Sequence, residues 1–471
     1  MSTVALETNQ IPAVPSWRRA DIQGLRAIAV LAVIAYHAGL PIPGGFTGVD
    51  VFFVISGFVI TEMLFREKIA TGTVKLGRFY IRRFRRLMPA LGLLVSATVL
   101  ASWFIYTSQS TQELTAQTGL GAIFFGANAV IAMTTGNYFD ALAEANPLLH
   151  TWSLSVEEQF YFVFPALLLL GWTFRKALST RLVIFILILT ISALSLALAV
   201  FGSSGAEQAP ESTSWLLGFY SPFTRIWEFG AGALIALAIP TIKLNNATAL
   251  MISVAGVIAG VAGFTLISDQ TPFPGVWTVI PVVATALLLA GGTRTNLISR
   301  TLSLTPMVKV GDWSYSLYLW HWPFIVFAIY IWPGNWFVPI IAALLSFLPA
   351  IASYYLVEQR FKANDTARQK SALRVVVPTW AVPGALAGAL ILSSTFLWIP
   401  NPGRASTDQL YTGEIGFGSL ESTLLEYRNA CGPFPIPALP GQTEERITCL
   451  QSQPKQGIDL AIIGDSHALA L

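Results

Sequence analysis

The chain has 471 residues, of which 54% are hydrophobic and only 11% are charged, and its mean hydropathy is +0.62. A soluble globular protein carries about 25% charged residues, so this composition excludes a water-soluble protein and indicates a chain that folds largely in lipid. The net charge of +3 says little by itself, and we expect no nucleic-acid partner.

The polar N-terminal stretch 1–20 contains no apolar segment followed by a small-residue cleavage site. We therefore predict no removable signal peptide. The stretch is expected to form a cytoplasmic tail, and the first apolar segment to act as an uncleaved anchor.

Apolar segments of about 20 residues recur along the chain, as expected for helices that cross a ~30 Å hydrocarbon core. We identify eleven, which predict an all-α polytopic membrane protein. They lie near 25–40, 46–65, 87–106, 153–172, 182–202, 223–240, 248–267, 276–291, 313–332, 337–357 and 375–398.

Basic residues predict the orientation, because Lys and Arg are enriched in cytoplasmic loops. With the N-terminus inside, 23 of the 28 basic residues fall in segments on the cytoplasmic side, and the outer connections before residue 399 contain none. A twelfth apolar segment, 116–136, would invert every later loop if it crossed completely. We therefore predict that it is re-entrant or lies in the outer half, and that the C-terminal segment is outside.

The predicted membrane domain covers 21–357 and is followed by a cytoplasmic linker at 358–374 and an additional span at 375–398. The composition of 399–471 is that of a soluble, extracytoplasmic segment. Cys431 and Cys449 fall within it, and whether they form a disulfide or stay free is left open.

A buried strand is predicted at 458–463, directly before the turn that contains Ser466. A strand and turn of this kind normally open a domain. We therefore interpret the sequence as a fragment that stops at the first motif of a further domain.

Two ionisable residues lie on the first span, where a charged group costs at least ~2.5–3.5 kcal/mol. Arg26 and His37 are 11 residues apart, close to three helical turns, so both side chains are expected on nearly the same face, separated by about 16 Å. Arg26 would lie at the inner boundary and His37 in the outer half. A neutral histidine bonded within the bundle is the alternative, and we favour a functional role.

Asp50 is predicted just inside the outer surface, at the start of the second span. Its carboxylate either orients the His37 imidazole or stabilises the helix N-terminus. Ser56 and Gly57 are interpreted as packing residues.

The densest charge cluster is the cytoplasmic run 78–89. Arg82 and Arg85 are interpreted as ordinary flanking charges. Arg83 and Arg86 are three residues apart and share a helical face, which suits bidentate binding of a phosphate-bearing donor.

Further along, Glu157 and Glu158 begin another span, and Arg225 at the outer start of a later span is their expected ion partner. A purely structural Glu–Arg pair is the alternative. His321 is predicted near mid-membrane, two residues before a helix-kinking proline, and we interpret it as supporting rather than catalytic.

By depth, His37, Asp50, Glu157, Glu158 and Arg225 are expected in the outer half of the membrane. Arg26, Arg83 and Arg86 are expected at the inner face. An outer base with carboxylates, opposite an inner phosphate site, predicts group transfer across the membrane.

Five motifs in order resemble the membrane acyltransferase-3 family. They are Asp21-Ile22-Gln23-Gly24-Leu25-Arg26 with His37, Gly48-Val49-Asp50-Val51-Phe52-Phe53, Phe79-Tyr80-Ile81-Arg82-Arg83, Trp152-Ser153-Leu154-Ser155-Val156-Glu157-Glu158-Gln159-Phe160-Tyr161 and Tyr315-Ser316-Leu317-Tyr318-Leu319-Trp320-His321-Trp322-Pro323. The last span and the Gly464-Asp465-Ser466-His467 turn look like the branch fused to an extracytoplasmic SGNH domain.

The resemblance implies a ten-helix acyltransferase bundle in the bacterial cytoplasmic membrane, with acyl-CoA as the cytoplasmic donor and an extracytoplasmic glycan as the acceptor. It implies His37 as general base or transient acyl acceptor, and Arg26, Arg83 and Arg86 as donor-site residues. Asp50, Glu157 and Glu158 are further catalytic candidates, and no bound cofactor or metal is expected. Ser466 corresponds to the SGNH nucleophile, which cannot be activated here without its base.

Two other interpretations compete with acyl transfer. An exporter of a glycan or lipid-linked precursor would use the same buried charges, but the paired broken helices of inverted-repeat transporters are missing. A scaffold that only anchors an outer esterase leaves Arg26, His37 and Arg225 unexplained. The sequence says nothing about oligomeric state, the sugar hydroxyl or the acyl chain length.

Overall fold

The computed structural model describes residues 19–106, 109–135, 138–139, 141–173, 180–205, 214–363 and 370–392. The predictions at Cys431, Cys449, Ser466 and the strand 458–463 lie outside these residues. Within them every regular element is helical and no strand occurs.

Seven described helices, or runs of helices, are long and apolar enough to cross a membrane. They are α1 (Ala20–His37), α2 (Gly48–Thr71, with the turn Gly45–Thr47), α3 (Leu76–Ile105), α7 (Thr151–Thr173), α8 (Thr180–Gly205), α11 (Asn246–Leu266) and the run Val338–Phe361. The chain is thus a polytopic helical membrane protein.

The other apolar segments are also helical. They form α10 (Ile226–Ala238), α12 (Val279–Gly291), α14 (Thr305–Ile331) and α18 (Lys370–Leu392). The run Val338–Phe361 combines α15 (Val338–Leu345), α16 (Phe347–Ser353), the π-helical turn Tyr354–Glu358 and the start of α17 (Gln359–Ala363). All eleven predicted spans fall on these helices, as far as the structure describes them.

The segment 116–136 forms no continuous helix. It contains the end of α4 (Gln109–Ile123) and all of α5 (Ala127–Thr134), separated by a turn at Phe125, whose φ of 57° is left-handed. At 1.5 Å per residue neither helix spans a ~30 Å core. Three more short helices complete the order, α6 (Ala141–Glu144), α9 (Ser214–Leu217) and α13 (Leu297–Leu302).

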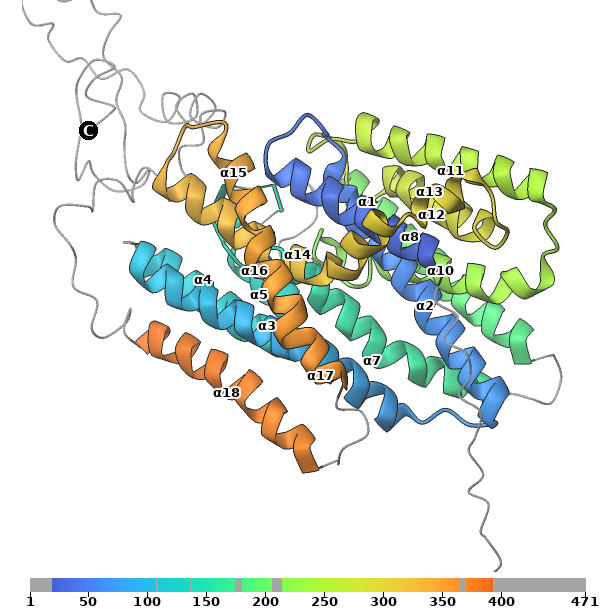
Figure 1. Cartoon of the computed structure of the whole chain (residues 1–471), viewed down its shortest axis with the longest axis horizontal. Coiled ribbons are helices and arrows are strands. Elements are labelled where there is room, and N and C mark those ends of the chain that lie inside the picture. Colours follow the sequence, from blue (N-terminus) through green and yellow to red (C-terminus); the bar gives the residue numbers. More distant parts are fainter. Residues whose placement is uncertain are drawn as a thin grey trace, which may run out of the picture.

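Helix α1 packs along α14 near the centre of the bundle (Figure 1). Gly311 of α14 allows this approach, because a Cβ there would overlap the Gln23 carbonyl of α1. The close packing brings the polar side chains of α1 and α14 within hydrogen-bond distance of each other.

A second close crossing joins α2 and α10. A Cβ on Gly57 would overlap the Phe229 backbone, and one on Gly232 would overlap the Val54 carbonyl. Gly57 is therefore a packing residue, as the sequence predicts. On one edge of the bundle α18 lies against α3 and α4, and on another α11 lies against α12 (Figure 1).

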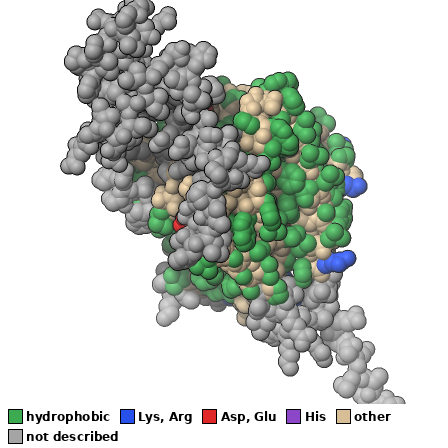
Figure 2. Space-filling view, turned by 90° about the vertical axis from the view of Figure 1, so that its left-hand side faces the viewer, with side chains coloured by type: hydrophobic (Ala, Val, Ile, Leu, Met, Phe, Trp, Pro, Cys, Tyr) green, Lys and Arg blue, Asp and Glu red, His purple; other side chains and the backbone are tan. Residues whose placement is uncertain are grey.

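Large apolar side chains cover the outside of the helices. Examples from α3, α7, α8 and α11 are Phe104, Phe162, Leu194 and Ile258. Figure 2 shows a face that is mostly hydrophobic, with the visible Lys and Arg side chains at its right-hand edge. A surface of this kind is compatible with lipid and not with water.

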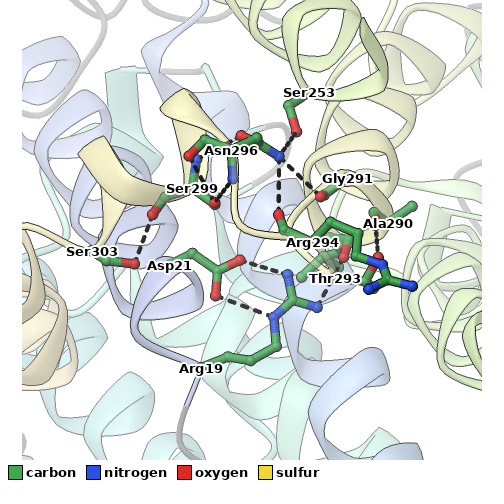
Figure 3. Close-up of polar contacts among 11 residues, drawn as sticks. Arg19, Asp21, Ser253, Ala290, Gly291, Thr293, Arg294, Asn296, Ser299 and Ser303 are labelled. Carbon is green, nitrogen blue, oxygen red and sulfur yellow. Dashed lines mark hydrogen bonds and ion pairs between the residues drawn. The ribbon is translucent and has the colours of Figure 1, made fainter. Parts of the chain in front are cut away.

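A polar cluster fixes the N-terminal end of α1 (Figure 3). Arg19 pairs with Asp21 at 2.5 Å and donates to the Leu289 carbonyl of α12 at 2.9 Å. Beside it, Asn296 caps α13 and donates to Ser253 of α11 at 3.1 Å. The cluster joins α1 to α11, α12 and α13 a few residues before Arg26.

Candidate active site

Polar side chains of α1 and α14 meet at two levels. Nearer the N-terminus of α1, the Arg26 guanidinium donates to the Ser314 hydroxyl at 2.9 and 3.1 Å. At the C-terminal end of α1, Nδ1 of His37 lies 2.9 Å from Nε2 of His321. Because both contacts run in the same order along the two helices, α1 and α14 are parallel and share one polar face.

His37 is the last residue of α1, and both of its ring nitrogens have partners. Nε2 lies 3.0 Å from the Tyr138 hydroxyl. Burial raises the pKa of the Tyr138 hydroxyl well above its usual value, so it stays protonated and can donate. The imidazole rings of His37 and His321 are nearly parallel, within 9°, with ring centroids 5.2 Å apart.

The hydrogen bonds define one tautomer for each neutral ring. Nδ1 of His321 lies 3.2 Å from the Leu317 carbonyl, which only accepts, so Nδ1 carries the proton. Nε2 of His321 then accepts from Nδ1–H of His37. This leaves a lone pair on Nε2 of His37, directed at Tyr138.

His150 lies on the other side of His321, with ring centroids 5.6 Å apart. His150 is 1% exposed. Neither of its ring nitrogens forms a hydrogen bond of normal geometry with a described group, and this includes the nearby Leu319 carbonyl. The described residues contain no group of three or more His, Cys, Asp or Glu placed to hold a metal ion.

A cavity of about 120 Å³ lies between α1, α2, α3, α7 and α14. It is lined by five charged residues, Arg26, Arg83, Arg86, Glu157 and Glu158, which we call its charged floor, and by apolar side chains including Phe52 and Phe125. Tyr318 lines the end nearer the histidines, which we call the upper end.

Arg83 is engaged by the two glutamates. Its guanidinium donates to both oxygens of Glu158 at 2.5–3.0 Å and lies 3.4 Å from Glu157, which also accepts from Ser56 at 2.6 Å. Arg86 lines the same cavity, but it forms no ion pair with a described carboxylate and its Nε has no hydrogen-bond partner. Arg86 is thus a cation of the cavity that no described carboxylate neutralises, and Arg26, bonded to the Ser314 hydroxyl, is another.

A separate ion cluster lies deep between α2 and α10. One guanidinium nitrogen of Arg225 contacts Asp50 at 2.8 Å and Glu228 at 3.2 Å, and all three side chains are at most 1% exposed. Arg225 also faces the Phe219 ring at 4.6 Å, which in turn stacks on Tyr138 at 4.4 Å. The Phe219 and Tyr138 rings thus lie between this cluster and His37.

One prediction from the sequence is therefore wrong. Glu157 and Glu158 pair with Arg83 and not with Arg225, because they lie about two turns into α7 and so away from its N-terminal end. Of the two alternatives for Asp50, the orientation of His37 does not hold, because Asp50 contacts Arg225, whereas its place in the first turn of α2 agrees with the helix-terminus alternative.

Other predictions agree with the geometry. Arg83 and Arg86 share one cavity, and Arg26 and His37 share one helix face toward α14. His321 supports His37 directly.

Four polar residues of the site are missing from the sequence predictions. Tyr138 lies in a loop, where periodicity gives no signal. Tyr318 lies within the motif Tyr315–Pro323, and His150 lies two residues before the motif that begins at Trp152. Glu358, which we expected to begin the linker, is 1% exposed and bonded to Ser316 of α14. Its position at the end of an apolar run is the signal that could have found it.

Comparison with known proteins gives this arrangement a family. The profile described as "Acyltransferase domain" matches residues 19–358. The O-acetyltransferase OatA of Staphylococcus aureus is 31% identical over 350 residues, which cover 72% of this chain and 56% of that protein. The peptidoglycan O-acetyltransferase OatA of Listeria monocytogenes is 30% identical over 360 residues, covering 73% and 56%.

A third relative, the putative membrane-bound transacylase BcsY of Komagataeibacter xylinus, is 34% identical over 388 residues, covering 79% of this chain and 92% of that protein. The chain belongs to the acyltransferase-3 family. It spans about half the length of the two OatA proteins. No solved structure matches it.

Proposed function

We propose that this chain is a membrane O-acyltransferase that moves an acyl group from cytoplasmic acyl-CoA to a hydroxyl of an extracytoplasmic glycan. Acetyl is the acyl group that we propose first. The acceptor would be a cell-surface polysaccharide or peptidoglycan. The observation that carries the proposal is the alignment, along α1 and α14, of an arginine-lined cavity with a histidine whose Nε2 lone pair faces the Tyr138 hydroxyl.

The cavity suits the donor. A CoA thioester ends in phosphates and reaches its acyl group through a long, uncharged arm. Phosphate groups would lie at Arg86, and the apolar walls above it would hold the arm. Arg83 would mainly position the floor, since Glu158 already pairs with it. No bound cofactor is required.

His37 suits the role of general base. Of the three histidines in the described residues, His37 alone is half-buried, whereas His150 and His321 are buried. The acceptor hydroxyl would replace Tyr138 at Nε2 of His37 and give up its proton there. The resulting alkoxide would attack the thioester carbonyl, the C–S bond would break, and the CoA thiolate would take the proton back from His37.

His321 would support this step. The Nδ1–H of His37 donates to Nε2 of His321, which fixes the tautomer and stabilises the imidazolium that forms. Catalysis of this kind typically contributes 10²–10⁴-fold. We place the protein in the bacterial cytoplasmic membrane, with the N-terminus inside and the end of α18 outside.

The test uses inverted membrane vesicles, which expose the cytoplasmic face, and acetyl-CoA labelled in the acetyl group. We expect label to appear in glycan inside the vesicles with wild type and to fall at least a hundredfold with His37→Ala. Arg82→Ala, a basic residue outside the cavity, is the control and should match wild type. Equal labelling with His37→Ala refutes the proposal, and glycan export without labelling would favour an exporter.

A further inference from the structure

The donor cavity and the histidines do not communicate in this structure. Tyr318 lines the upper end of the cavity, whereas neither His37 nor His321 lines it. On its other side the Tyr318 ring lies 5.5 Å from the His321 ring and 5.6 Å from the His150 ring, measured between centroids. Tyr318 therefore stands between the two parts of the site.

Hydrogen bonds hold the Tyr318 ring in place. Its hydroxyl lies 2.6 Å from the Ser153 hydroxyl, and both hydroxyls lie 3.1 Å from the His150 carbonyl. Since the carbonyl only accepts, one hydroxyl donates to it and the other donates to the first hydroxyl. The contact joins α14 to the beginning of α7.

Tyr318 is closely packed between the cavity and the histidines. Tyr318 and Ser153 are 6% and 4% exposed. Phe52 of α2 lies edge-on to the Tyr318 ring, with centroids 6.3 Å apart, and also lines the cavity. Three helices thus close the upper end of the cavity around one hydroxyl pair.

We propose that Tyr318, held by Ser153, is a specificity-determining residue that limits the length of the transferred acyl group. This inference rests on the proposed function. A thioester carbonyl at the top of the cavity has the Tyr318 ring directly beyond it. An acetyl group adds only a methyl group there, whereas each longer chain must occupy space that the ring fills.

The Tyr318 hydroxyl contributes to this limit on acyl length. Without its bonds to Ser153 and the His150 carbonyl, the ring would turn more freely and exclude longer chains less strictly. Tyr318 would also have to turn away for a bound acetyl group to be reached from His37. Removing the Tyr318 ring should therefore change the selectivity for acyl length more than it changes the binding of the donor.

The experiment measures glycan labelling in inverted vesicles with acetyl-CoA, butyryl-CoA and hexanoyl-CoA, each labelled in the acyl group. The readout is the ratio of kcat/KM for the longer donors to that for acetyl-CoA. We expect Tyr318→Ala to raise the butyryl-to-acetyl ratio at least tenfold. Tyr318→Phe and Ser153→Ala should raise it by a few fold, and Tyr355→Ala, which removes an exposed tyrosine, should leave it unchanged.

The outcomes separate the two proposals. If wild type transfers no label from any donor, the proposed function fails. If wild type transfers acetyl but Tyr318→Ala retains the wild-type ratio, only the role of Tyr318 fails. Should Tyr318→Ala not accumulate in the membrane, unchanged ratios in both Tyr318→Phe and Ser153→Ala would overturn it as well.

Discussion

Nδ1 of His37 and Nε2 of His321 are 2.9 Å apart, although 284 positions separate the two residues in the chain. The contact links the end of α1 to the middle of α14. It makes His321 an acceptor for His37 and leaves the lone pair of His37 on Nε2, facing Tyr138. The pair, rather than His37 alone, is the unit that would act as a base.

Replacing His321 with Leu should lower kcat about tenfold to a hundredfold, because His37 loses the acceptor that fixes its tautomer. The KM for acyl-CoA should stay unchanged, since His321 does not line the donor cavity. His321→Gln keeps an oxygen that accepts from His37 and should retain more activity than His321→Leu. Steady-state kinetics in inverted vesicles would check this, and a change confined to KM would contradict it.

Spacing within one helix was enough to predict part of this site. Arg26 and His37 are 11 residues apart on α1, and the structure directs both toward α14. Arg83 and Arg86 likewise share a cavity. The helical repeat alone determines such relationships.

Partners on different helices were predicted less well. The two glutamates were assigned to Arg225 by estimated depth, and His37 was one of two alternatives for Asp50. The actual partners depend on which helices cross and where they begin. Glycines at the α2–α10 crossing bring Asp50 to Arg225. Tyr138 comes from a loop, whose position no periodicity reveals.

Arg83 and Arg86, two of the three arginines that line the donor cavity, should respond differently to substitution. Arg86→Ala should raise the KM for acetyl-CoA about tenfold or more, because a charged hydrogen bond contributes about 1.5–3 kcal/mol. The folded protein should be little affected, since Arg86 forms no ion pair with a described carboxylate. Arg82→Ala is the matched control, and an equal KM in both variants would remove Arg86 from the donor site.

Arg83→Ala should instead destabilise the fold, because it leaves Glu158 mostly buried without its cation. The expected loss is about 3 kcal/mol, typical of breaking such a pair. Thermal unfolding in detergent would measure it. Adding Glu158→Gln removes the unpaired charge and should recover much of the loss, whereas a double variant as unstable as Arg83→Ala would argue against a pairing effect.

In the cluster of Arg225, Asp50 and Glu228, loss of the cation should destabilise the protein more than loss of one carboxylate. Arg225→Ala leaves two carboxylates buried beside each other and should cost about 3–5 kcal/mol of stability. Glu228→Gln keeps an acceptor for Arg225 while one carboxylate still balances its charge, so it should change stability by less than about 1 kcal/mol. Unfolding midpoints of the two variants in detergent give the comparison, and a reversed order would contradict it.

Acyl transfer should depend on Gly311, which sets the distance between α1 and α14. A Cβ at this position overlaps the Gln23 carbonyl, which belongs to backbone and cannot turn away, so Gly311→Ala must separate α1 from α14. That movement would lengthen both the Arg26–Ser314 and the His37–His321 contacts. We expect at least a tenfold loss of acyl transfer, measured as label in glycan at equal amounts of protein in the membrane.

Gly388→Ala is the matched control, because a Cβ there meets no atom within 4 Å and the residue lies within helix α18. Alanine favours a helix over glycine by up to about 1 kcal/mol, so this variant should be as active as wild type and at least as stable. Wild-type transfer by Gly311→Ala would show that the reaction does not depend on the spacing of α1 and α14. The two aligned contacts between α1 and α14 would then lose their role in the proposed mechanism.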